Sequence, residues 1–252
     1  MKEIILILMT MLSTLTFSKK LYVGTNAEFV PYEYLENGEI KGFDIELMEA
    51  IGKELGYEII WQNMAFDGLL PALQMNKIDA VIAGMTPTEE RKKSVNFSVP
   101  YMLVDSNEHF IIVNSSSNIS DKSQIKGKKV GVQLGTIQEE FANQLGASTQ
   151  LYNDVSSALM DLKSNKIEAV IVPDASGKNY LKTISGIKKG GIIIDNSQGA
   201  AIAMRKNDIE LCNSINETLI TINKNGKYLE ILKKFFPEKV SQYNTMNIEK
   251  NQ

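Results

Sequence analysis

The residue best suited to bind a charged ligand is Arg91, which follows a short apolar run. Residues 78–83 have the composition of a buried strand. The next residues fit a capping box, with Thr86 at the N-cap, Pro87 at the first helical position and Glu89 three residues after the cap. A helix start offers free N–H groups, and a guanidinium binds a carboxylate through two parallel hydrogen bonds. The segment is therefore either an anion site or an ordinary helix start whose guanidinium pairs with nearby glutamates or solvent.

Four further positions could complete a pocket around this guanidinium. Gly84 lets backbone approach a ligand without a Cβ in the way. Phe29 and Phe66 lie where a strand ends or a helix begins, the places where ligands of open α/β sheets bind. Thr136 could cap a second helix, whose free N–H groups would face the first set. The alternative for each phenylalanine is an ordinary place in the core.

Composition excludes several function classes. The formal net charge is −3 and the pI about 5.4, which argues against nucleic acid or an anionic membrane surface as the main partner. The chain has one Cys, Cys212, and one His, His109, so it has no internal disulfide and no Cys/His metal cluster. No paired carboxylates with a nucleophile or metal stand out, which argues against an enzyme. We expect no metal and no cofactor.

The N-terminus predicts an exported protein. Residues 4–17 are uncharged and too few to span a bilayer comfortably, and compact residues flank a plausible cleavage site after residue 18. We therefore expect residues 1–18 to be a secretory signal peptide and the mature chain to be soluble and extracytoplasmic. The alternative is a buried N-terminal helix.

Short β-branched runs alternate with amphipathic stretches, which is typical of an α/β fold with mainly parallel sheets. The predicted strands are 21–24, 58–61, 78–83, 109–113, 192–194 and 200–204. The predicted helices are 45–55, 66–75, 211–222 and 227–235.

An internal repeat indicates two lobes of like design. Residues 76–82 are NKIDAVI and residues 165–171 are NKIEAVI, and each run follows an apolar-periodic helix. A Val-Gly pair ends a short strand at residues 23–24 and again at 130–131. The alternative is that helix–Asn–Lys–strand junctions are simply common.

The chain is expected to cross between the lobes twice, near residues 104–107 and 196–199. The predicted first lobe comprises residues 19–105 and 198–252, and the predicted second lobe residues 106–197. Two linkers beside a cleft are typical of hinge closure around a ligand.

The sequence resembles the extracellular solute-binding proteins for polar amino acids, the binding subunits of ABC importers. The matching segments are GFDIEL at 42–47, FDGLLPAL at 66–73, AGMT at 83–86, TEER at 88–91, NFS at 96–98, PY at 100–101, VGV at 130–132 and GT at 135–136. The resemblance covers essentially the whole predicted mature chain, and these segments follow the family's order. The resemblance implies the two-lobed periplasmic-binding-protein-like fold of type II, with an open sheet flanked by helices in each lobe and two hinge strands.

The resemblance also implies roles for single residues. Arg91 would clamp the ligand carboxylate, helped by Thr86 and the N–H of Thr136. The carbonyl of Gly84 would accept from the α-ammonium. Phe29 and Phe66 would enclose the ligand side chain. The other positions expected to line the site or its rim are Asn26, Glu28, Ala83, Met85, Gln133, Ile137 and Gln138.

The sequence departs from the family at the ammonium site. Pro173 stands where relatives have an acidic residue, and Asp174 follows it, so either Asp174 takes the role or the ammonium is held otherwise. Asn26 stands where relatives with basic ligands often have Asp. Glu28 beside Phe29 could pair with a guanidinium instead. We therefore expect arginine first, lysine or ornithine next, and glutamine as the neutral competitor.

The expected function is a monomeric, non-enzymatic binding protein. It would close on a free amino acid and present it to the membrane permease of an ABC importer. One alternative is a ligand-sensing subunit for signalling. A second is a small-molecule dehydratase on the same fold.

Overall fold

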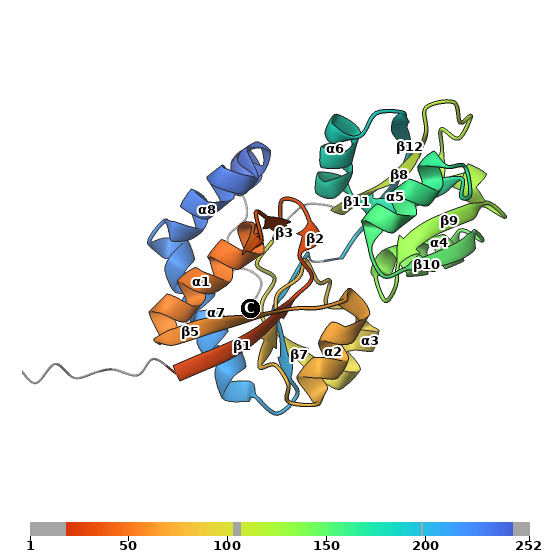
Figure 1. Ribbon diagram of the computed structural model, residues 1–252. Coiled ribbons are helices and arrows are strands. Elements are labelled where there is room, and N and C mark those ends of the chain that lie inside the picture. Colours follow the sequence, from red (N-terminus) through yellow and green to blue (C-terminus); the bar gives the residue numbers. More distant parts are fainter. Residues whose placement is uncertain (1–18, 103–106, 198, 244–252) are drawn as a thin grey trace, which may run out of the picture.

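The computed structural model describes residues 19–102, 107–197 and 199–243 of the 252-residue chain. The predicted signal peptide, residues 1–18, lies outside them. The chain forms two five-stranded sheets and one small three-stranded sheet. Figure 1 shows the two large sheets with their helices as two separate masses, in agreement with the predicted two-lobed α/β fold. Within the described residues, the structure contains no helix with the length and hydropathy of a membrane span.

The first lobe has the strand order β5-β1-β6-β13-β7. These strands are β1 (Lys19–Thr25), β5 (Tyr57–Asn63), β6 (Ala80–Val81), β7 (Val95–Phe97) and β13 (Ala203–Arg205). The helices are α1 (Phe43–Leu55), α2 (Phe66–Gln74), α3 (Glu89–Ser94), α7 (Ile209–Lys224), α8 (Lys227–Phe235), α9 (Val240–Tyr243) and the 3-10 helix η2 (Pro237–Lys239). One face of the sheet packs on α1, α7 and α8, and the other on α2, which gives three layers.

The second lobe has the order β10-β9-β11-β8-β12. These strands are β8 (Asn107–Asn114), β9 (Lys129–Gln133), β10 (Ser148–Tyr152), β11 (Ala169–Pro173) and β12 (Ile187–Asp195). The helices are α4 (Ile137–Gln144), α5 (Val155–Lys163), α6 (Asp174–Thr183) and the 3-10 helix η1 (Lys122–Ile125). Here α5 and α6 cover one face and α4 the other. The small sheet, β2 (Glu28–Phe29), β3 (Glu33–Glu36) and β4 (Glu39–Lys41), follows β1.

The sequence repeat is a structural repeat. Val23 pairs with Ala80 in the first lobe, and Val130 pairs with Ala169 at the same register in the second. The asparagine that begins each repeat adopts the left-handed conformation, with φ of 56° at Asn76 and 58° at Asn165. In both copies the next N–H donates back to the preceding helix, which closes the helix end in the same way.

The sheets are mixed, and only three neighbouring strands in each are parallel to one another. In the first lobe β13 and β7 complete the sheet as antiparallel neighbours, and in the second β8 and β12 do so. Both β13 and β8 are the first strands after the chain enters a lobe, so they arrive without the helical crossover that produces parallel pairing. The expectation of mainly parallel sheets therefore applies to the repeated part alone.

The chain passes between the two sheets twice, between β7 and β8 and between β12 and β13. The predicted crossings near 104–107 and 196–199 fall in these connections. Residues 103–106 and 198, which include the predicted lobe boundaries, lie outside the described part of the chain.

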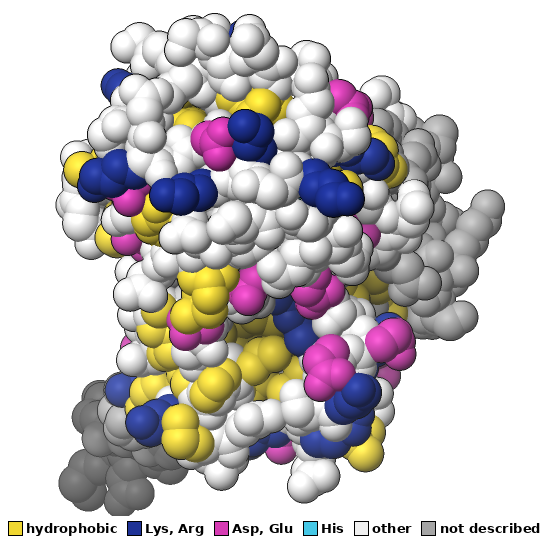
Figure 2. Space-filling view, turned by 90° about the vertical axis from the view of Figure 1, so that its right-hand side faces the viewer, with side chains coloured by type: hydrophobic (Ala, Val, Ile, Leu, Met, Phe, Trp, Pro, Cys, Tyr) yellow, Lys and Arg dark blue, Asp and Glu magenta, His cyan; other side chains and the backbone are white. Residues whose placement is uncertain are grey.

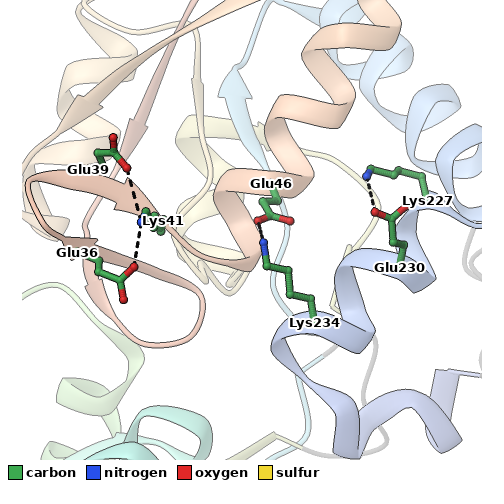
Figure 3. A network of polar contacts seen from close by, with 7 residues as sticks. All are labelled: Glu36, Glu39, Lys41, Glu46, Lys227, Glu230 and Lys234. Atoms are coloured by element: carbon green, nitrogen blue, oxygen red, sulfur yellow. Dashed lines mark hydrogen bonds and ion pairs between the residues drawn. The ribbon is translucent and has the colours of Figure 1, made fainter.

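Exposed ion pairs lie on the surface of the first lobe (Figure 3). The pairs drawn are Lys41 with Glu36 and Glu39, Lys227 with Glu230, and Lys234 with Glu46. The pair of Lys234 and Glu46 joins α8 to α1, whose apolar faces already pack together. Exposed pairs of this kind contribute little to stability, so the buried apolar clusters hold the lobe together.

Candidate ligand-binding site

A cavity lies between the lobes, where concave small-molecule sites are commonly found. Its lining comes from both lobes and from the segments next to the crossings. The lining residues are Phe29, Tyr32, Phe66, Ala83, Gly84, Thr86, Arg91, Met102, Glu108, His109, Thr136, Ile137, Gln138, Pro173, Asp174, Asp195 and Ala200. Figure 2 shows a hollow between the upper and lower parts of the molecule, with hydrophobic side chains inside it and acidic side chains along its border.

Most of the predicted site residues line this cavity. They are Phe29, Phe66, Ala83, Gly84, Thr86, Arg91, Thr136, Ile137, Gln138 and Asp174. Four predicted residues are not part of the lining, namely Asn26, Glu28, Met85 and Gln133. Sequence reasoning missed Tyr32, Met102, Glu108, His109, Asp195 and Ala200 as lining residues and had noted Pro173 as a departure.

Arg91 is held in place by backbone carbonyls and an aromatic ring. Its Nη1 donates to the carbonyl of Thr86 at 2.7 Å, and its Nη2 donates to the carbonyl of Gly135, in the second lobe, at 2.8 Å. The guanidinium carbon lies 5.4 Å from the centre of the Phe66 ring. Burial lowers the pKa of Arg91 to about 10, so the group stays cationic near pH 7. No carboxylate in the described part of the chain forms an ion pair with it, and its positive charge is available to a ligand.

The predicted helix cap is wrong by two residues. Helix α3 begins at Glu89, and Thr88 is its N-cap, because the Thr88 hydroxyl accepts from the N–H of Arg91. The carbonyl of Thr86 is occupied by the guanidinium of Arg91 and by the N–H of Thr88, so it cannot begin the helical hydrogen-bond ladder. Thr86 lines the cavity and does not cap the helix.

A buried carboxylate, that of Asp44, holds the backbone N–H of Gly84 in place. Asp44 Oδ2 accepts from the N–H of Gly84 at 2.8 Å and from the Tyr101 hydroxyl at 2.6 Å. Burial raises the pKa of Asp44 to about 6, although those two hydrogen bonds counteract it. Burial and the charge of Asp44 raise the pKa of the neighbouring Glu33 well above its usual value. Gly84 itself has φ of 54°, a conformation that favours glycine.

The second donor set is only partly formed as predicted. Thr136 is the N-cap of α4 by position, but its hydroxyl donates to the carbonyl of Gln133 at 2.7 Å instead of accepting from the helix. Ile137, the first helical residue, and Gln138 are buried at the cavity wall. Further along, Phe141 and Leu145 pack on the core of the second lobe.

Asn26 and Gln133 bind each other across the cleft. Gln133 Nε2 donates to Asn26 Oδ1 at 2.9 Å and to the carbonyl of Asn153 at 3.0 Å. Asn26 Nδ2 donates to the carbonyl of Met64. These two residues therefore connect the lobes, and their polar groups are directed at each other.

Glu28 and Met85 also lie away from the cavity lining. Burial and the charge of Asp154 raise the pKa of Glu28, and the N–H of Val155 at the start of α5 partly offsets this. The Glu28 carboxylate is thus next to the second lobe's α5 and not beside the cavity. Met85 is fully buried in the core formed with α2.

Among the described residues, three carboxylates of the second lobe line the cavity. Asp174, which begins α6, pairs with Lys178 Nζ at 2.7 Å. Asp195, at the end of β12, accepts from the N–H of Ser197 at 2.9 Å and from its hydroxyl at 2.6 Å. Glu108 lies at the start of β8. Their positions could have been anticipated, because Glu108 and Asp195 immediately flank the two predicted crossings, where side chains meet the cleft.

The comparisons with known proteins agree with this geometry. A family model for bacterial extracellular solute-binding proteins, family 3, matches residues 21–238. The arginine-binding extracellular protein ArtP of Bacillus subtilis is 40% identical over 226 residues, which cover 86% of this chain and 86% of that protein.

Solved structures of similar sequence have the same fold. An ancestral arginine-binding protein bound to arginine gives a TM-score of 0.79 at 40% identity and covers 86% of this chain and 98% of its own. An ancestral arginine-binding protein bound to glutamine gives 0.80 at 40% identity, covering 86% and 97%. All of these relatives are binding proteins and not enzymes.

Proposed function

We propose that this chain, which belongs to the bacterial extracellular solute-binding proteins of family 3, captures a free polar amino acid between its lobes and delivers it to the permease of an ABC importer. The observation that carries this proposal is the charge pattern of the cavity. Arg91, which has no ion-pair partner among the described residues, comes from the first lobe, and the lining carboxylates come from the second. An amino acid presents the opposite charges, a carboxylate and an ammonium on one carbon.

The first lobe would bind the carboxylate. The Phe66 ring packs against the Arg91 guanidinium, and the carbonyl of Thr86 accepts a hydrogen bond from it. The orientation of the planar guanidinium is therefore already fixed before a ligand binds. A ligand carboxylate would take over donors that now bind the Gly135 carbonyl. Thr86 and Gly84 lie beside the clamp on the same wall.

The second lobe would complete the site when the hinge closes. Inter-lobe hydrogen bonds, from Gln133 to Asn26 and from Tyr180 to the carbonyl of Glu28, would hold the closed form. Closure removes the ligand's charges from water, so each of them needs a partner in the cavity. The two lobes provide partners of both signs.

Arginine is the preferred ligand of this proposal. Among the described residues, the cavity lining holds three carboxylates and one guanidinium, and Lys178 offsets one of the three carboxylates by pairing with Asp174. An amino acid with a cationic side chain brings two positive charges and one negative charge, which balances the remainder. The relative bound to glutamine keeps a neutral side chain as the competing candidate.

Calorimetric titration with the twenty amino acids and ornithine tests the proposal. We expect one or a few polar amino acids to bind with micromolar affinity or better, with arginine the tightest. If none binds better than millimolar, the proposal fails. Deleting the neighbouring permease then distinguishes transport from sensing, because only a transport protein depends on that permease for uptake of its ligand.

Export is part of the same proposal. Residues 1–18 would direct secretion and be removed, leaving an extracytoplasmic monomer. N-terminal sequencing of the exported chain should begin at or next to Lys19. A chain that retains Met1 in the cytoplasm would contradict this part of the proposal.

A further inference from the structure

Because position 173 is a proline, it cannot supply a carboxylate for the ligand's ammonium. It ends β11 and lines the cavity, but its side chain carries no charge. The adjacent carboxylate, Asp174, is engaged with Lys178 at 2.7 Å. Although burial opposes it, the pKa of Lys178 is raised by Asp174 and by the charges of Glu238 and Glu108. Lys178 therefore lies among the acidic groups on the α6 side and competes with a ligand cation there.

Asp195, unlike Asp174, lines the cavity without an ion pair to a lysine among the described residues. Its side chain is 13% exposed, and among the described residues no Lys or Arg pairs with it. The N–H and hydroxyl of Ser197 fix its carboxylate from behind. These neutral donors orient the group and leave its negative charge uncompensated, as a site for a cation requires.

His109 gives a second, independent sign that something binds here. It is 4% exposed and lines the cavity, and its Nε2 has no hydrogen-bond partner within the described residues. Gln138 Nε2 lies 3.0 Å from His109 Nδ1, and donation from the amide places the imidazole proton on Nε2. That nitrogen is 3.8 Å from Asp195 Oδ2, longer than a hydrogen bond. The ring therefore flanks the carboxylate without saturating it.

The location of Asp195 suits the α-ammonium in particular. Arg91 binds the Gly135 carbonyl, and Gln138 follows three residues later on α4. Gln138 contacts His109, and His109 faces Asp195, so a continuous wall joins the guanidinium to the carboxylate. Because the α-carboxylate and the α-ammonium share one carbon, their partners must lie on adjoining parts of the wall.

We propose that Asp195 is the counter-charge of the ligand's α-ammonium, with His109 and Ser197 as its positioning residues. The inference rests on the proposed function, since it names the partner of one group of an amino-acid ligand. It assigns to the segment before the second crossing the role that an acidic residue at position 173 would otherwise have. Because Asp195 lies next to the second crossing between the lobes, its contact with an ammonium would favour closure of the hinge. Ligands without an ammonium would not have this effect.

Calorimetry with two ligands tests the assignment. One is arginine, and the other is 5-guanidinopentanoate, which is arginine without its α-ammonium. In the wild-type protein we expect arginine to bind at least about 100-fold tighter. In Asp195→Asn this ratio should fall at least tenfold, because arginine binding weakens while binding of the deaminated ligand is nearly unchanged. Asp174→Asn tests the competing carboxylate and should change this ratio less than Asp195→Asn does.

The opposite pattern overturns the assignment. If Asp174→Asn loses the ratio and Asp195→Asn keeps it, Asp174 is the partner and the proposed function stands. If the wild-type protein binds neither ligand nor any other amino acid, both proposals fail. Should Asp195→Asn not fold, Asp195→Glu keeps the charge but moves it by one methylene, and its ratio should still fall several-fold. An unchanged ratio in Asp195→Glu would also overturn the assignment.

Discussion

The two lobes share the same helix–strand scaffold, but the residues that follow its last strand carry opposite charges. In each, a helix closes on an asparagine with positive φ, and the next strand pairs with the strand that contains the Val-Gly pair. The prediction that this pair ends its strand is wrong, because β1 continues to Thr25 and β9 to Gln133. Where the strand after the asparagine ends, the first lobe continues into Gly84 and Arg91, whereas the second continues into Pro173 and Asp174. The repeated residues position the strand ends, and the residues that follow determine which charge reaches the cleft.

The lobes also hold their carboxylates differently. Asp44 is buried beneath the cavity wall, where it fixes Gly84 and Tyr101 and does not line the cavity. Asp195 lies at the cavity itself. The first lobe therefore uses negative charge to support a positive site, and the second lobe presents negative charge directly.

Removing Arg91, the one cation among the described lining residues, should have the largest effect on binding. Arg91→Ala should weaken arginine and glutamine alike by at least about 100-fold, because it leaves the ligand carboxylate buried without a partner. Lys93→Ala, an exposed cation on the same helix, is the control and should bind as wild type. Calorimetry measures both. A loss for arginine alone would mean that Arg91 does not contact the shared carboxylate.

The two carboxylates should shift stability with pH in opposite directions. Burial raises the pKa of Asp44 to about 6, so the folded chain retains a proton that the unfolded chain has released. Relative to Asp44→Asn, the wild-type protein should therefore lose stability as pH rises from 4 to 6, by about 3 kcal/mol at most. Urea unfolding at several pH values measures this slope.

For Asp195 the pH dependence of stability has the opposite sign. Burial alone would raise its pKa, but His109 and Ser197 lower it overall. Its stabilising contribution is present above the unfolded pKa near 4 and is lost as pH falls through the lower folded value. Relative to Asp195→Asn, the wild-type protein should lose stability in that acidic window. Slopes of the same sign for both carboxylates would contradict the comparison.

A matched pair of glycines tests whether the repeats are equivalent. A Cβ on Gly24 would lie 2.5 Å from Ile78 Cδ1, and one on Gly131 would lie 2.7 Å from Ile167 Cδ1. Each alanine substitution should lower the free energy of unfolding by about 1–3 kcal/mol. Gly68→Ala meets nothing within 4 Å and should not lower it. A large cost in one lobe only would show that the two junctions are not packed alike.

The contact between the lobes should have the smallest effect. Gln133→Ala removes the hydrogen bond to Asn26 and leaves a buried acceptor unpaired. We expect arginine to dissociate about five- to tenfold faster, in line with roughly 1 kcal/mol for one lost hydrogen bond. Stopped-flow dissociation measures this, with the exposed Gln150→Ala as control. An unchanged dissociation rate would show that the hydrogen bond between Gln133 and Asn26 does not stabilise the closed form.

Local patterns predicted the scaffold well. The strand–helix alternation and the NKIDAVI and NKIEAVI echo depend on neighbouring residues alone, and both appear in the structure. Pocket positions next to strand ends, such as Gly84 and Thr136, were also predicted, because a strand end fixes where the next residues lie.

Contacts between distant segments were not predictable in the same way. Thr88 caps α3 in place of Thr86, because the Thr86 carbonyl is taken by a side chain. Asn26 and Gln133 are 107 residues apart and satisfy each other across the cleft. The sequence pattern shows that each could line a pocket, but it does not show which partner each finds in three dimensions.

The most direct test of the central claim is calorimetric titration of the wild-type protein with arginine and its two single-charge analogues, agmatine and 5-guanidinopentanoate. Agmatine lacks the carboxylate that Arg91 would bind, and 5-guanidinopentanoate lacks the ammonium that the second lobe would bind. We predict that arginine binds at least about 100-fold tighter than either analogue. Equal affinity for arginine and agmatine would contradict the claim that the cavity recognises the two charges of an amino acid from opposite lobes.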